Sequence, residues 1–142
     1  MIHIMVAGIA GAFMALQGVL NSGVGKAVGM LKATFAVHLA AITAMVPLLL
    51  IIREASSGKF TSVKWFYYLG GPLNIAIVYF VAWAVSRIGA CRATTAIITC
   101  QVLTAAALDH FGVLGLERAP FHPLRLAGVG MLSIGAWLLL RK

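Results

Sequence analysis

The chain has 142 residues, of which 62% are hydrophobic and 10% charged, and it carries a formal net charge of +8. A soluble domain carries roughly a quarter charged residues, so this chain cannot cover a water-facing surface. The high hydrophobic content excludes a soluble domain and intrinsic disorder. The presence of only two cysteines excludes a disulfide scaffold. It predicts an integral membrane protein.

Five nearly uncharged stretches follow one another along the chain. Each has about 15–21 residues, close to the roughly 17–25 that a helix needs to cross the hydrocarbon core, and the short ones can gain a turn from a polar flank. Lipid offers no partner to an open backbone, which favours helices over strands. We expect an all-α membrane protein, one domain over 1–142, with helices at about 2–20, 33–52, 66–86, 93–111 and 124–140.

The first stretch is predicted to be a retained helix rather than a signal peptide. No basic residue precedes Lys26, so the basic n-region of a signal peptide is missing. Gln17 and Asn21 lie one turn apart on this helix and are candidate ligands of a substrate. Small residues recur every three or four positions, which favours close packing within a subunit or between subunits: Ala7, Gly11, Ala15, Gly18 and Ser22.

The second and third stretches carry the candidates His38 and Asn74. A polar side chain inside a membrane is costly unless it faces a cavity or a partner helix. His38 can therefore serve as a hydrogen-bonding residue between helices or as a proton carrier. Pro47 and the run Gly70-Gly71-Pro72 are expected to weaken the local helix hydrogen bonds.

The fourth stretch places Thr94, Gln101 and Thr104 on one helix face, because intervals of seven and three residues return to a similar angle. Gln101 is the strongest candidate, since its amide lies near mid-helix and both donates and accepts. The two threonines can instead bond back to carbonyls of their own helix. Asp109 is expected at the water interface or at the mouth of a substrate path.

The fifth stretch carries Gly128 and Gly135, which lie two turns apart on one face. Small residues at this spacing let membrane helices approach closely. The pair is a candidate dimer interface, and packing within one subunit is the alternative.

The basic residues occur singly or in pairs near helix ends, which is typical of membrane helices and not of a nucleic-acid surface. With a cytoplasmic N-terminus, five would be cytoplasmic: Arg53, Lys59, Lys64, Arg118 and Arg125. Six would lie on the other side: Lys26, Lys32, Arg87, Arg92, Arg141 and Lys142. Because this balance gives no positive-inside bias, it predicts either dual topology with antiparallel pairing or an orientation set by other signals.

No pattern for enzymatic or metal chemistry is present. The sequence has no CxxC, no His-x-x-x-His, no clustered carboxylates and no GxSxG. Cys91 and Cys100 are separated by about 13 Å of rise on one helix, too far for a disulfide. We therefore expect neither an enzyme nor a bound metal or cofactor.

The chain resembles the drug/metabolite transporter superfamily, and within it the short five-helix YdcZ-like branch, a single-repeat relative of the EamA-type carriers. The resemblance covers nearly the whole chain and rests on four runs: Gln17-Gly-Val-Leu-Asn21-Ser; Trp65…Leu69-Gly70-Gly71; Gly89-Ala90…Gln101…Leu108-Asp109-His110-Phe111-Gly112; and Arg125-Leu-Ala-Gly128…Gly135. It implies a small-solute carrier built from two inverted repeats, here two chains. The Gly128/Gly135 spacing is similar to the glycine motif of the dimerising helix in the small multidrug resistance relatives.

One departure from those relatives concerns the mechanism. They carry a glutamate in the middle of the first helix, where this chain has Gly11-Ala-Phe-Met-Ala-Leu16. A desolvated organic cation needs a counter-charge, so proton/cation antiport is not expected. We expect a multi-pass protein of the bacterial inner membrane that carries a small polar or neutral metabolite by alternating access in an antiparallel homodimer. A dual-topology channel and a membrane subunit without transport activity are the alternatives.

Overall fold

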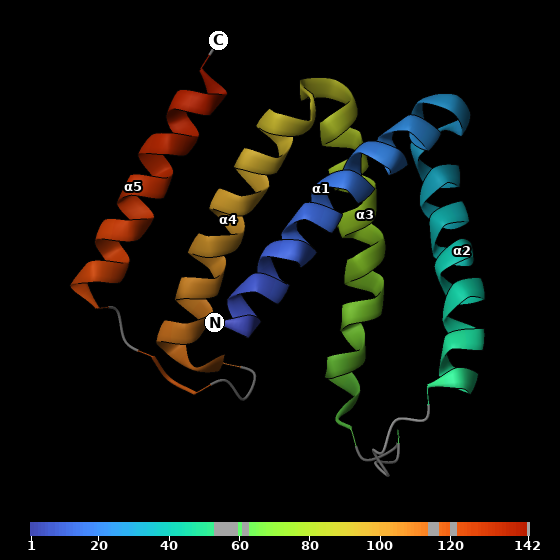
Figure 1. Ribbon diagram of the computed structural model, residues 1–142, viewed down its shortest axis with the longest axis horizontal. Helices are drawn as coiled ribbons and strands as arrows, with labels where there is room; N and C mark the ends of the chain where they lie inside the picture. Colours follow the sequence, from blue (N-terminus) through green and yellow to red (C-terminus); the bar gives the residue numbers. More distant parts are fainter. Residues whose placement is uncertain (53–59, 61–62, 114–116, 120–121, 142) are drawn as a thin grey trace. The chain divides into compact units, whose positions relative to one another are not determined.

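The computed structural model describes residues 1–52, 60, 63–113, 117–119 and 122–141. Its elements are α1 (Ile2–Val28), α2 (Met30–Ile51), the 3-10 helix η2 (Trp65–Leu69), α3 (Gly70–Ile88), α4 (Ala90–Phe111) and α5 (Pro123–Leu140) (Figure 1). No strand occurs among these residues, and five helices are long and apolar enough to cross a membrane. The prediction of an all-helical protein with five membrane-spanning segments is confirmed. Three basic residues that entered the orientation count lie outside the described residues: Arg53, Lys59 and Lys142.

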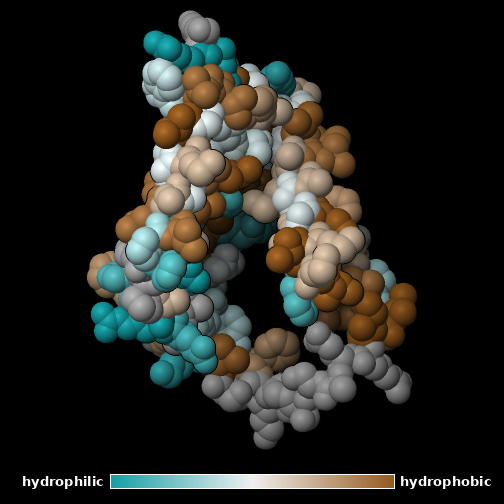
Figure 2. All heavy atoms as spheres, turned by 60° about the vertical axis from the view of Figure 1, so that its left-hand side comes forward, coloured by the Kyte–Doolittle hydropathy of each residue, from teal (hydrophilic) through white to brown (hydrophobic). Residues whose placement is uncertain are grey.

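The large apolar side chains point outward along the helices. Phe13 is 66% exposed, Phe80 64% and Leu138 59%. In Figure 2 hydrophobic residues cover much of the visible helix surface, and hydrophilic residues gather toward the top and the lower left of the view. Such a surface is stable in lipid and would be unstable in water.

α2 and α4 each begin three residues before the predicted position, at Met30 and Ala90, and two larger differences have identifiable reasons. α1 continues past residue 20 to Val28, because polar side chains do not interrupt helix hydrogen bonds. It ends where Gly29 adopts a φ of +93° and donates its N–H to the carbonyl of Gly25 at 2.9 Å. Only glycine adopts this backbone conformation readily, and α2 begins at the next residue, Met30.

The second difference is at the start of α3. The third helix was predicted from residue 66, but Trp65–Leu69 form the 3-10 helix η2 and the α-helix begins at Gly70. In a continuous α-helix the ring of Pro72 would clash with the carbonyl of Tyr68. Starting at Gly70 places Pro72 in the first turn, where a missing N–H has no cost. Pro47, by contrast, lies inside α2.

The structure divides into two compact units, Met1–Arg87 with α1, α2 and α3, and Ile88–Lys142 with α4 and α5. In the first unit the buried residues of α1 are small or polar, namely Gly18, Asn21, Ser22 and Gly25, and those of α3 are Val78, Ala82 and Val85. A Cβ added to Gly18 would lie 3.0 Å from Cγ1 of Val81 and 3.5 Å from Cγ2 of Val85. The absence of a side chain at Gly18 therefore lets α1 approach α3 closely.

In the second unit α4 and α5 pack together through small residues, with Ala93 and Ala136 buried. Gly112 closes α4 in the left-handed conformation, with a φ of +61°, and donates to the carbonyl of Leu108 at 2.9 Å. Asp109 and Arg125 form an ion pair at 4.0 Å between the end of α4 and the start of α5.

Candidate functional site

His38 and Asn74 join α2 to α3 inside the first unit. Nδ1 of His38 lies 2.7 Å from the carbonyl oxygen of Thr34, one turn earlier on α2, and Nε2 lies 3.2 Å from Nδ2 of Asn74. A carbonyl oxygen only accepts, so Nδ1 carries the proton and Nε2 accepts the hydrogen bond that Asn74 donates. The two contacts therefore select the tautomer that carries its proton on Nδ1.

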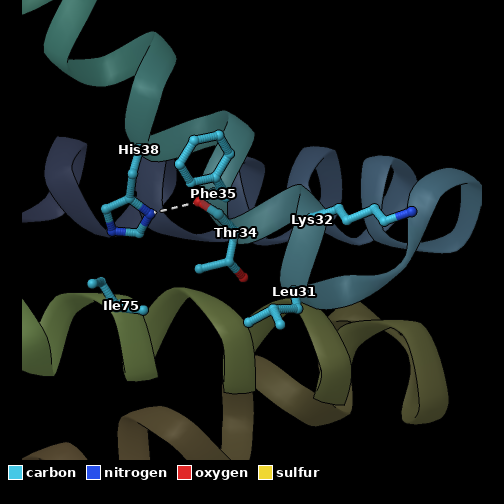
Figure 3. Close-up of a pocket in the computed structure, with 6 residues that line it drawn as sticks. All are labelled: Leu31, Lys32, Thr34, Phe35, His38 and Ile75. Carbon is cyan, nitrogen blue, oxygen red and sulfur yellow. Dashed lines mark hydrogen bonds between the residues drawn. The ribbon is translucent and has the colours of Figure 1, made fainter.

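A cavity of about 470 Å³ lies beside this pair, and nearly all its surface is apolar. Five of its lining residues come from α2 and one from α3: Leu31, Lys32, Thr34, Phe35, His38 and Ile75. Figure 3 shows the His38 ring and Ile75 on facing helices, while Lys32 extends in the opposite direction from the ring. The cavity thus combines an apolar wall with one imidazole at its edge.

Thr34 is part of this site and was missed by the sequence analysis. It is 3% exposed, its hydroxyl donates to the carbonyl of Met30 at 2.9 Å, and its own carbonyl accepts from His38. The signal that could have found it is the spacing of four residues between Thr34 and His38, which places both on one helix face.

Asn21 and Gln17 lie in different environments although they are one turn apart. Asn21 is 8% exposed and Ser22 is 4% exposed, both inside the first unit, whereas Gln17 is exposed. Among the described residues, no hydrogen bond is formed by the side chain of Asn21, Ser22 or Gln17. The Asn21 residue is thus mostly buried, while its amide atoms keep enough exposure to remain available for hydrogen bonds.

The polar face predicted on α4 is uncovered within its own unit. Gln101 and Thr104 are exposed and Thr94 is half-buried. The expected bonds from threonine to its own helix are instead made by Thr95, to the carbonyl of Cys91, and by Thr99, to the carbonyl of Thr95, both at 2.8 Å. Thr94, Gln101 and Thr104 make no side-chain hydrogen bond in the part of the chain that the structure describes.

The two predicted interface glycines have open space around them. A Cβ added at Gly128 or Gly135 would meet nothing within 4 Å. Gly128 is exposed, while Gly135 is half-buried and lines a groove of about 510 Å³ whose α4 side is formed by Thr95, Ile98 and Thr99. Neither glycine is therefore required by packing inside the second unit.

No group of three or more His, Cys, Asp or Glu side chains that could hold a metal occurs among the described residues. Cys91 and Cys100 are both free and exposed.

Comparison with known proteins assigns the family. No curated protein and no solved structure matches the chain. The family described as "Putative inner membrane exporter, YdcZ" matches residues 2–138, nearly the whole chain. The five membrane-spanning helices agree with that description. The chain belongs to the YdcZ family, a branch of the drug/metabolite transporter superfamily, and is a multi-pass protein of the inner membrane.

Proposed function

We propose that the chain is a secondary transporter that exports a small polar or neutral metabolite by alternating access, and that it works as an antiparallel homodimer. The observation that carries the proposal is His38, which lines an apolar cavity between two membrane-spanning helices and accepts a hydrogen bond from Asn74. Polar groups at membrane depth are costly and mark solute pathways by default.

The cavity supports a solute that forms hydrogen bonds. Asn74 uses one N–H on His38, so its second N–H and its carbonyl oxygen can bind a ligand. Both ring nitrogens of His38 are already engaged, Nδ1 with the carbonyl of Thr34 and Nε2 with Asn74, so His38 orients the Asn74 amide and the solute bonds to that amide. A hydroxyl or amide of a metabolite fits these groups, and the apolar wall fits its carbon skeleton.

The distribution of acidic residues supports a neutral solute over a cation. The chain has three acids, Glu54, Asp109 and Glu117. Among the described helices only α4 carries one, Asp109, in its last turn and paired with Arg125. A cation at mid-membrane would meet no counter-charge from the described helices, and an unpaired buried charge is expensive.

The uncovered polar residues support a second copy. Gln17, Gln101 and Thr104 are exposed on membrane-spanning helices, where lipid cannot hydrogen-bond to them. The open space at Gly128 leaves room for another helix. The balanced basic residues are compatible with copies that insert in both orientations, as an inverted pair requires.

Reconstitution into liposomes tests the proposal. The first step is a thermal-shift screen of sugars, amino acids and nucleosides against the purified protein, because a bound ligand stabilises by RT ln(1 + [L]/Kd). The stabilising solute is then loaded into liposomes, where a carrier shows saturable uptake and counterflow. Asn74→Leu should abolish both, and Thr43→Val, whose hydroxyl bonds only within α2, should retain both. Large unsaturable flux would indicate a channel, and the absence of flux a subunit without transport activity.

A further inference from the structure

A second cavity, of about 370 Å³, lies where α1, α2 and α3 meet at one end of the first unit. Its lining includes Lys26 in the last turn of α1, Arg87 in the last turn of α3, and Met30, which is the first residue of α2. It shares no lining residue with the cavity beside His38. Because it is built from the ends of helices long enough to span a membrane, we expect it at the depth of the lipid headgroups.

The charge of this cavity is positive and uncompensated. No acidic residue lines it. Within the described residues the ion pair found is Arg125–Asp109, so neither Lys26 nor Arg87 has a carboxylate partner. The carbonyl ends of α1 and α3 attract these cations, but each helix end offers only about half a charge. Two full positive charges therefore exceed what the backbone supplies.

Two further features favour an anion here. α2 begins at the cavity with Gly29 as its N-terminal cap, which has no side chain to bind the free amides, and its first turn has no acid. The Arg87 guanidinium lies 6.0 Å from the ring centroid of Trp83, which also lines the cavity. This contact restrains the guanidinium while leaving its N–H donors available.

We propose that this cavity binds a phosphate anion, either as the headgroup of an anionic phospholipid or as a free phosphate. Lys26 and Arg87 would hold the phosphate oxygens by charge-assisted hydrogen bonds. Ser86 donates its hydroxyl proton to the carbonyl of Trp83 at 2.6 Å, so binding rests on the two cations. The site is independent of the transport proposal, since it uses none of the residues assigned to the solute.

Isothermal titration of the full-length protein in a neutral detergent tests the site with three probes. These are a short-chain phosphatidylglycerol, a short-chain phosphatidylcholine, whose choline cancels the phosphate charge, and inorganic phosphate. Saturable binding of phosphatidylglycerol, with phosphatidylcholine at least about tenfold weaker, supports a lipid headgroup. Binding of inorganic phosphate as tight as that of phosphatidylglycerol supports a free phosphate. No saturable binding of either anion overturns the proposal.

The charge-removal variant K26Q/R87Q should bind the anion at least about tenfold more weakly, because two charge-assisted contacts are lost. The matched control is K64Q/R141Q, which removes one Lys and one Trp-stacked Arg elsewhere, since Arg141 lies 4.3 Å from the Trp137 ring centroid. The control should bind within about twofold of the unaltered protein. Equal binding by both variants overturns the proposal.

A measurement on the unaltered protein keeps the test decisive if the double variant fails to fold. Raising the salt concentration from about 50 to about 500 mM should weaken anion binding several-fold, because the contact is between charges. Binding that is insensitive to salt overturns the proposal whatever the variants do.

Discussion

Nε2 of His38 accepts a hydrogen bond from Nδ2 of Asn74 across 3.2 Å, joining α2 to α3 although the two residues are 36 positions apart in the chain. The bond is possible because the carbonyl of Thr34 takes the proton on the other ring nitrogen, at 2.7 Å. The three groups form a chain of two hydrogen bonds in which each group orients the next. This arrangement makes the pair a link between α2 and α3.

The first prediction concerns the energetic coupling of this pair. His38→Leu and Asn74→Leu should each lower the free energy of unfolding by about 0.6–2 kcal/mol, the range measured for hydrogen bonds between membrane helices. The double variant should lose less than the sum, because either change alone removes the shared bond. Unfolding in mixed micelles measures the four free energies. Thr43→Val is the control, since the Thr43 hydroxyl bonds to the carbonyl of Leu39 on its own helix at 2.9 Å. Losses of stability at His38 and Asn74 that are strictly additive would contradict the coupling.

The second prediction concerns the contact between α1 and α3. Gly18→Leu should destabilise the protein by about 1–3 kcal/mol, because even a Cβ there would lie 3.0 Å from Val81 and the helices must separate. Gly11→Leu is the matched control on the same helix, since a Cβ at Gly11 meets nothing within 4 Å. Thermal unfolding of the two variants in detergent compares them. An equal effect of the two substitutions would show that α1 and α3 do not pack through Gly18.

The third prediction concerns the dimer. If Gly128 and Gly135 face the second copy, replacing either with Leu should shift the protein toward monomer, because a branched side chain holds the helices apart. Insertion should continue, since the helix becomes more apolar. Gly130→Leu is the control, because Gly130 is equally uncovered but lies on another face of α5. Light scattering in detergent measures the mass of the protein. If the dimer persists after both substitutions, the interface lies elsewhere.

The fourth prediction concerns orientation. Balanced basic residues predict that C-terminal reporters are found on both sides of the membrane. Two or three lysines added beside Lys64 should then drive every copy one way and abolish transport. Co-expression with an oppositely biased copy should restore it. Reporters on a single side would rule out dual topology and leave a parallel arrangement or a monomer.

The fifth prediction separates ligand binding from packing at Asn21 and Gln101. Neither side chain has a hydrogen-bond partner among the described residues, so Asn21→Leu and Gln101→Leu leave no group of this chain unpaired. Stability should therefore be nearly unchanged. Binding of the solute should be lost, since an unpaired ligand group costs about 1–3 kcal/mol. Thermal unfolding with and without solute measures both quantities. Variants that lose stability but bind normally would identify these amides as contacts between helices.

Much of the architecture could be predicted because it is local. A backbone in lipid must satisfy its hydrogen bonds within its own segment, so each long apolar stretch becomes a helix regardless of its neighbours. The predicted helix bounds differed most from the structure where a single residue changes the backbone conformation. The 3-10 turn before Gly70 follows from the steric demand of Pro72, and the end of α1 from the positive φ of Gly29.

The candidate site could be predicted only in its residue types. His38 and Asn74 stood out as polar residues in apolar helices, but nothing in their spacing indicated that they meet. The threonines on α4 show the same limit, since Thr95 and Thr99, and not Thr94 and Thr104, bond to their own helix. A change of one position along a helix rotates a side chain by about 100°, and a helix that is apolar on every side gives no periodicity from which to read the buried face.

The sequence by itself determined that this protein has five membrane-spanning helices, has three acidic residues in all and has no metal-binding motif. These properties depend on composition and on hydrogen bonding within a segment. Only the tertiary structure decided that His38 meets Asn74 and that Lys26 and Arg87 line one cavity. Helices in lipid associate through close contact of their surfaces rather than by burying apolar stripes away from water, so the register of one helix against the next is set by the shapes of particular side chains, such as the missing one at Gly18.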